Sequence, residues 1–192
     1  MNENIEQSIP DEYWKIDEDT KAAGFNMASD MLTCSLLRTL ASAKRGSTFL
    51  EMGTGTGLST AWILDGMDAA STLTSFDNNE TVLSIARKHL GHDRRLQLVH
   101  SDGEAWLQQN ADKKFDFIFA DTWHGKYLLL NETIALLNPG GIYMVDDMLP
   151  QPNWPEGHAE KATQFVIDLE NHPDLTLTKQ NWSTGIIIAV KK

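Results

Sequence analysis

A glycine-rich turn between a short apolar segment and a helix-like segment constrains the fold of this chain most strongly. Residues Thr48–Met52 are apolar and β-rich, Gly53-Thr54-Gly55-Thr56-Gly57 follows at once, and helical spacing begins with Ser59–Leu64. Glycines at alternate positions let the backbone bend sharply and approach a ligand that a Cβ would exclude. A strand, a tight turn and a helix in this order are typical of a βαβ unit. The turn therefore predicts an α/β fold in which a ligand contacts the loop.

The same alternation of short β-rich runs and longer helical periods continues along the chain. It predicts a Rossmann-like sheet with helices between its strands. Asn78 or Asn79 is expected to cap a helix, and Ser101-Asp102-Gly103-Glu104 resembles a capping box. Further strands are expected at Thr72–Phe76, Leu96–Val99, Phe115–Ala120, Ile142–Val145, Leu175–Lys179 and Gly185–Val190. The helix capped by Asn78 or Asn79 is expected to run through Ile85 to Leu90, and further helices are expected at Ala28–Ala43, Lys126–Leu137 and Ala159–Leu169.

Length and charge limit the class of protein. The chain has 192 residues and 41% hydrophobic composition, which suits one core and hence a single domain. Its formal net charge of -11 disfavours nucleic acid and anionic membranes as partners, so we expect a small-molecule substrate. One cysteine, Cys34, excludes an intrachain disulfide, and Met1–Asp19 holds no apolar run typical of a signal peptide. These features predict a cytoplasmic protein.

The spacing around the glycine turn indicates which ligand the loop binds. A dinucleotide fold requires Gly-x-Gly-x-x-Gly, whereas this loop is Gly-x-Gly-x-Gly with Glu51 two residues before the first glycine. An acid there is poorly placed beside a pyrophosphate but well placed near a cationic ligand, either directly or through backbone and water. S-adenosylmethionine carries an ammonium and a sulfonium. Asp77, at the end of the second strand, can accept hydrogen bonds from both ribose hydroxyls, and Ser101-Asp102-Gly103 follows the third strand as an adenine-facing loop.

With these residues in view, the segment Phe49–Thr60 resembles the first motif of class I S-adenosylmethionine-dependent methyltransferases. Phe115–Asp121 and Leu136–Asp147 resemble motifs of the subgroup that includes catechol and caffeoyl-CoA O-methyltransferases. The resemblance implies one domain over residues 27–192, preceded by a cap segment over residues 1–26. It also implies a mostly parallel seven-stranded sheet of order 3-2-1-4-5-7-6 with helices on both faces. The predicted cofactor contacts are Met27, Glu51, Gly53, Thr54, Gly55, Gly57, Ser59, Asp77, Asn78, Ser101, Asp102, Asp121 and Trp123.

Acidic residues end the fourth and fifth expected strands, which the implied order places side by side. Asp121, Asp146 and Asp147 would form an oxygen-rich site suited to Mg²⁺ or Ca²⁺, and the metal-dependent subgroup binds its ion at these positions. Such an ion would lower the pKa of a bound substrate hydroxyl. The subgroup usually has Asp-Asn where this chain has Asp146-Asp147. The extra negative charge would change or abolish the preference for Mg²⁺ or Ca²⁺. The alternative is that these acids only solvate the strand ends.

The loop after Asp121 resembles the one that carries a lysine general base and an aromatic wall in the subgroup. His124 stands at the lysine position, and a histidine can accept a hydroxyl proton near neutral pH. Lys126 is the second candidate. The predicted catalytic residues are therefore His124, Lys126 and Asp121, and the predicted reaction is O-methylation of a phenol- or catechol-like hydroxyl.

Other functions are compatible with the same pattern. A metal-independent small-molecule N- or O-methyltransferase would use Asp146 and Asp147 for an amine or for nothing. A nicotinamide oxidoreductase would require the Gly-x-Gly-x-x-Gly spacing that this loop lacks. A non-catalytic protein that holds S-adenosylmethionine is a further alternative, and a homodimer is expected from the resemblance alone.

Overall fold

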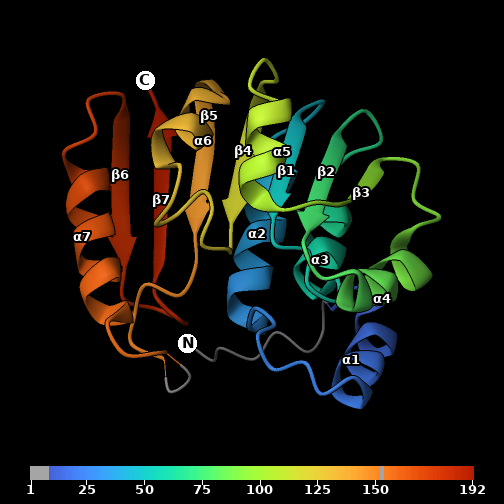
Figure 1. The fold of residues 1–192 in the computed structure, drawn as a ribbon. Coiled ribbons are helices and arrows are strands. Elements are labelled where there is room, and N and C mark those ends of the chain that lie inside the picture. Colours follow the sequence, from blue (N-terminus) through green and yellow to red (C-terminus); the bar gives the residue numbers. More distant parts are fainter. Residues whose placement is uncertain (1–8, 152–153) are drawn as a thin grey trace.

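The computed structural model describes residues 9–151 and 154–192, and a seven-stranded sheet runs through them in the order β3-β2-β1-β4-β5-β7-β6 (Figure 1). All neighbouring strands pair in parallel except β7, which is antiparallel to both β5 and β6. This confirms the predicted fold class and strand order. The strands are β1 (Thr48–Met52), β2 (Thr72–Asp77), β3 (Leu96–His100), β4 (Phe115–Ala120), β5 (Leu137–Val145), β6 (Leu175–Gln180) and β7 (Ile186–Lys191).

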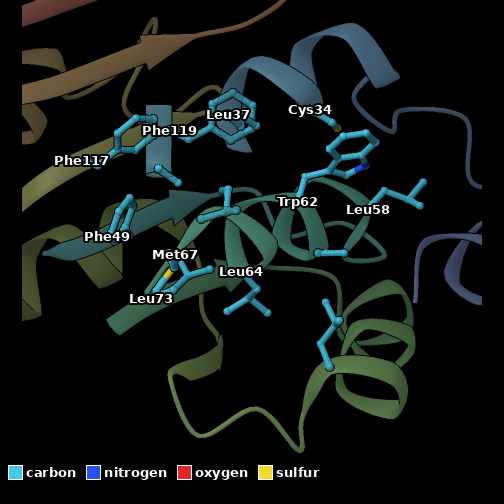
Figure 2. Packing of buried hydrophobic residues seen from close by; sticks show 14 of the residues in the cluster. Cys34, Leu37, Phe49, Leu58, Trp62, Leu64, Met67, Leu73, Phe117 and Phe119 are labelled. Carbon is cyan, nitrogen blue, oxygen red and sulfur yellow. The ribbon is translucent and has the colours of Figure 1, made fainter. Parts of the chain in front are cut away.

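Helices cover both faces of the sheet because alternate strand residues point to opposite sides. In β4, Phe117 and Phe119 join one buried cluster, whereas Ile118 and Ala120 join the other. Figure 2 shows the first cluster, in which Leu37 lies near Phe119 and Trp62 lies near Cys34 and Leu58. The helices are α1 (Tyr13–Ala22), α2 (Met31–Ala43), α3 (Leu58–Gly66) and α4 (Glu80–Leu90) on the side of the first cluster, and α5 (Gly103–Gln109), α6 (Leu130–Ala135) and α7 (His158–Glu170) on the other.

Short polar side chains determine where several helices begin. Asp30 accepts hydrogen bonds from the backbone of Leu32 and Thr33, so α2 begins at Met31 rather than at Ala28 as predicted. Asn79, one of the two predicted candidates, caps α4. The predicted capping box begins one residue too early, because Asp102 rather than Ser101 accepts the backbone N–H groups of the first turn of α5. Each cap fixes the direction of a helix that leaves the ligand-binding end of the sheet.

The predicted helix Lys126–Leu137 is wrong over its first turn. Leu129 adopts a left-handed conformation with φ of 58°, and helix α6 begins only at Leu130. The predicted fifth strand, Ile142–Val145, is too short, since β5 begins at Leu137 and pairs with β4 through an irregularity between Phe115 and Phe117. The turn before α6 leaves Lys126 free to point along the sheet edge instead of from a helix.

The predicted cap segment, residues 1–26, is described from residue 9 onward, and residues 1–8 lie outside the described part of the chain. Within it, Tyr13 and Ile16 of α1 are buried in the first cluster, and α1 contacts α3 and α4. Helix α1 therefore packs on the domain beside the glycine loop, where Thr20 hydrogen-bonds to Thr56. Among the residues that the structure describes, no helix combines the length and apolar character needed to cross a membrane.

Candidate functional site

A cleft lies at the carboxyl ends of β1 and β4, where the strand order reverses direction. Ligands of open α/β sheets bind at this kind of switch point. The backbone N–H of Asp121 donates to the carbonyl of Met52 at 3.0 Å, which joins the two strand ends. The cleft has a volume of about 590 Å³. Nine of the predicted cofactor residues line it: Met27, Gly53, Thr54, Gly55, Ser59, Asp77, Asn78, Asp121 and Trp123.

The glycine loop approaches its neighbours too closely for side chains. Gly53 has φ of 104°, and a Cβ there would lie 2.6 Å from Cγ2 of Thr122. Gly57 has φ of 96° at the start of α3, and its Cβ would lie 2.9 Å from the Cβ of Ala86 in α4. Gly57 does not line the cleft, so its role is to let α3 and α4 pack closely.

Asp77 connects the second strand to the glycine loop. Its Oδ2 accepts a hydrogen bond from the N–H of Gly55 at 2.8 Å, and its Oδ1 accepts one from the N–H of Asn79 at 2.9 Å. Each carboxylate oxygen can accept a further bond, and the residue lines the cleft. The arrangement holds the carboxylate at the strand end where the sequence predicted a ribose contact.

Glu51 is buried behind the loop rather than in the cleft wall. Its carboxylate accepts hydrogen bonds from the hydroxyls of Ser59 at 2.6 Å, Thr60 at 2.5 Å and Ser75 at 2.6 Å. Burial raises its pKa to about 7, and the three hydroxyl bonds oppose that rise. Glu51 does not line the cleft, so the geometry disfavours the direct contact with a cationic ligand. The predicted indirect routes ran through backbone and water, whereas the structure places the hydroxyl of Ser59, which lines the cleft, on the Glu51 carboxylate.

The loop after β3 forms a small hollow of about 60 Å³ beside the cleft. Ser101 and Gly103 line it, together with Asp77, Asn78 and His124. Asp102 lines neither cavity, because its carboxylate caps α5. The hollow therefore continues the cleft on the side where the sequence predicted an adenine.

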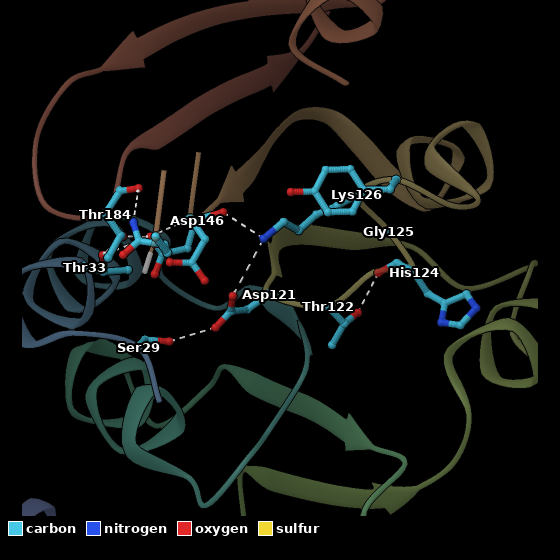
Figure 3. A network of polar contacts seen from close by, with 12 residues as sticks. Ser29, Thr33, Asp121, Thr122, His124, Gly125, Lys126, Asp146 and Thr184 are labelled. Atoms are coloured by element: carbon cyan, nitrogen blue, oxygen red, sulfur yellow. Dashed lines mark hydrogen bonds and ion pairs between the residues drawn. The ribbon is translucent and has the colours of Figure 1, made fainter. Parts of the chain in front are cut away.

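Three acidic residues, Asp121, Asp146 and Asp147, interact at the ends of β4 and β5. Figure 3 shows Asp121 and Asp146 with the side chain of Lys126 directed toward them. Nζ of Lys126 lies 2.8 Å from the carbonyl oxygen of Asp146 and 3.8 Å from Oδ1 of Asp121. The Lys126 side chain is only 5% exposed. Oδ1 of Asp146 accepts from Thr33, from Thr184 and from the N–H of Asp147.

The electrostatics of this acid group are dominated by burial. Burial raises the pKa of Asp121, Asp146 and Asp147, and the nearby ammonium of Lys126 opposes the rise at Asp121 and Asp147. Asp121 also accepts a hydrogen bond from Ser29 at 2.9 Å. The buried ammonium of Lys126 therefore partly offsets the negative charge of Asp121 and Asp147.

The predicted metal set does not fit this geometry. Among the described residues, no three histidine, cysteine or acidic side chains are placed to hold a metal ion. The ammonium of Lys126 lies where a divalent cation would have to approach Asp121, and hydrogen-bond donors already contact Oδ1 of Asp146. Asp121, Asp146 and Asp147 thus come together as predicted, with the Lys126 ammonium placed against Oδ1 of Asp121 and the backbone carbonyl of Asp146.

The two candidates for proton transfer point in different directions relative to Asp121. Figure 3 shows the Lys126 side chain directed toward Asp121 and the His124 ring directed away from it. His124 instead packs against Gly103, where an added Cβ would lie 2.6 Å from the Cβ of His124. The geometry therefore favours Lys126 over His124 as the partner of the acid group.

Several site residues were missed by the sequence analysis. Ser29, Thr33 and Thr184 donate to the acid group, and Phe25 and Leu128 line the cleft. Ser29 directly precedes the N-cap Asp30, which is the one local signal that could have drawn attention to it. Nothing in the neighbouring sequence marks the others.

Fold and site together define a class I methyltransferase domain. A family model described as "Methyltransferase domain" matches residues 50–148, more than half of the chain, and the chain belongs to this family. This confirms the class predicted from the glycine loop.

Individual proteins agree with that assignment. A Mycobacterium avium (strain 104) protein described as "Putative O-methyltransferase" is 30% identical over 118 residues, which cover 58% of this chain and 52% of that protein. The chain thus spans about half the length of the curated relatives that it matches. A Bacillus cereus O-methyltransferase in complex with SAH superposes with a TM-score of 0.83 at 20% identity, covering 94% of this chain and 90% of that one. The O-methyltransferase TomG from Streptomyces achromogenes, in complex with SAM, superposes with a TM-score of 0.81 at 20% identity, covering 96% of this chain and 91% of that one. The two superpositions show a shared fold.

Proposed function

We propose that this protein transfers the methyl group of S-adenosylmethionine to a hydroxyl of a small, apolar or aromatic molecule. The observation that carries the proposal is the cleft at the β1–β4 switch point, in which Gly53, Asp77 and Asp121 face one volume. The relatives named above are described as O-methyltransferases, and two solved neighbours hold SAM or its product SAH, which supports the same cofactor here.

Exposed apolar side chains at the rim of the cleft support the proposal of an apolar acceptor. Met27, Trp123 and Leu128 are 67%, 43% and 47% exposed, and all three line the cleft. Large apolar side chains left exposed at a concave site are typical of ligand contacts. A flat ring with a hydroxyl could lie against them with the hydroxyl toward Asp121. This is the phenol- or catechol-like acceptor that the sequence predicted.

In the proposed reaction the acceptor oxygen attacks the methyl carbon in line with the sulfonium. The new O–CH₃ bond forms as the S–CH₃ bond breaks, which leaves S-adenosylhomocysteine. Asp121 takes the hydroxyl proton, because it lines the cleft and burial raises its pKa above the usual carboxyl range. Lys126, 3.8 Å from Oδ1 of Asp121, acts through that carboxyl and holds it at the cleft wall. The protein otherwise contributes position and the exclusion of water.

Calorimetric titration tests the cofactor before any acceptor is known. S-adenosylmethionine and S-adenosylhomocysteine are expected to bind at one site, and NAD is not. Asp77→Ala should weaken both by about 10- to 150-fold, since a charge-assisted hydrogen bond contributes roughly 1.5–3 kcal/mol. Asp112→Ala, an exposed aspartate in the turn before β4, is the matched control and should bind normally.

Labelled cofactor with a panel of phenols, catechols and amines then tests the acceptor. Methylation of hydroxyl compounds supports the proposal, and methylation of amines alone contradicts it. Failure of both S-adenosyl compounds to bind, or binding of NAD in their place, would remove the proposed function altogether.

A further inference from the structure

The lysine inside the acid group has a geometry unlike that of a surface lysine. Lys126 follows a glycine in a left-handed conformation, Gly125 with φ of 88°, and the turn directs the side chain along the carboxyl edge of the sheet. Its Nζ is held by the carbonyl of Asp146 at 2.8 Å. With 5% of the side chain exposed, the ammonium has little water to compensate its charge, so the acids must do so.

The acids in turn depend on that ammonium. Asp121 and Asp146 are largely withdrawn from solvent, and Asp147 lies beside them with φ of 59°. Several like charges buried together repel one another unless a cation is present. Ser29, Thr33 and Thr184 offer hydroxyl hydrogen bonds, but among the described residues only Lys126 brings a positive charge within 4 Å of this group.

A divalent cation could not join this arrangement without displacing the lysine. Mg²⁺ and Ca²⁺ require six or more oxygen ligands, and the ammonium would repel either ion at short range. Oδ1 of Asp146 already accepts three hydrogen bonds, from Thr33, Thr184 and the N–H of Asp147.

We infer that Lys126 is the resident cation of the Asp121, Asp146 and Asp147 group, and that this covalently attached ammonium takes the place of a divalent metal. Lys126 is thus a positioning residue that holds Asp121 at the cleft wall. The inference deepens the proposed function and rests on it only for the consequence that methyl transfer needs no added metal.

Thermal unfolding of the full chain without cofactor or acceptor tests the inference directly. The wild-type protein is titrated with MgCl₂, CaCl₂ or MnCl₂ at constant ionic strength and compared with EDTA. Wild-type Tm is expected to stay within about 1 °C throughout. Lys126→Met keeps the apolar stem and removes the positive charge that would repel a cation from the carboxylates of Asp121 and Asp147. For a dissociation constant near 50 μM, about 5 mM cation should raise its Tm by about 5–10 °C.

Two further variants separate the effect of removing the positive charge from a general structural effect of the substitution. Lys126→Arg retains a cation and should remain unresponsive to all three metals. Lys161→Met removes a neighbouring lysine that lies 4.4 Å from the Trp123 ring, outside the acid group, and should also remain unresponsive.

The results distinguish this inference from the proposed function. A wild-type Tm that rises by several degrees with a divalent cation overturns the inference, and so does a folded Lys126→Met that responds to none. Calorimetry of wild type with MnCl₂ decides the matter even if Lys126→Met does not fold: heat of specific binding refutes the inference, and its absence supports it. Failure of the cofactor to bind would instead refute the proposed function and leave these measurements valid.

Discussion

Replacing Glu51 by glutamine should change how the stability of the fold depends on pH. The carboxyl is fully buried, and its pKa rises from an ordinary 4.5 to about 7 in the folded protein. Between pH 4.5 and 7, the protein therefore takes up a proton at Glu51 when it folds. The stabilising contribution is complete below pH 4.5 and is lost as pH rises through 7. Since one pKa unit corresponds to about 1.4 kcal/mol, the wild-type protein should lose about 2.5 kcal/mol at this residue between pH 5 and 8.

Glu51→Gln lacks this titration and keeps the shape of the side chain. Its amide can donate to the hydroxyl of Ser59, while its carbonyl still accepts from Thr60 and Ser75. The free energy of unfolding of the variant should therefore fall less steeply with pH than that of wild type. The difference between the two proteins should move by about 2.5 kcal/mol in favour of the variant from pH 5 to pH 8.

Urea unfolding followed by tryptophan fluorescence at pH 5, 6, 7 and 8 and at constant ionic strength measures this difference. Comparing the two proteins cancels the titration of Asp121 and Asp146, which both retain. The control is Glu132→Gln, an exposed residue of α6 whose charge is screened by solvent. If the free energy of unfolding depends on pH in the same way for wild type and Glu51→Gln, the reasoning is refuted, because the pKa of Glu51 would then be the same in the folded and unfolded protein.

Two further predictions concern the loop and the cleft. Gly57→Ala should destabilise the protein by roughly 2–5 kcal/mol in urea unfolding, because the residue is left-handed and its Cβ would lie 2.9 Å from that of Ala86. Gly140→Ala, left-handed with nothing within 4 Å, should cost only about 1 kcal/mol, and equal costs would exclude the close packing of α3 and α4 as the reason. His124→Ala should raise the KM for the cofactor several-fold and leave kcat within about twofold, since the ring is directed away from Asp121. A hundredfold loss of kcat with unchanged cofactor affinity would instead identify His124 as the general base.

Much of the fold could be predicted from residue patterns because those patterns are local. Alternation along a strand and three- to four-residue spacing along a helix record which face is buried, so β1 and β4 were predicted with the observed bounds. The glycine loop was equally informative, since its left-handed and crowded positions accept few other residues. Asp77 was placed at the cleft because the end of a parallel strand is known once the strand is known.

The sequence could not predict how the acid group is neutralised. Ser29 and Asp121 are 92 positions apart, and Thr184 and Asp146 are 38 apart, so no periodicity connects the partners. The tertiary structure also moved the start of the predicted helix from Lys126 to Leu130, because a left-handed Leu129 and a buried Lys126 outweighed local helical spacing.

The sequence by itself determined the order of elements, the loop that faces the cleft and the acids that end the strands, since each depends on neighbours along the chain. Only the tertiary structure decided that Glu51 lies behind the loop and that the Lys126 ammonium lies between Asp121 and the backbone carbonyl of Asp146. The physical reason is that the surroundings of a charge, and hence its pKa and its partners, depend on which distant segments exclude water from it.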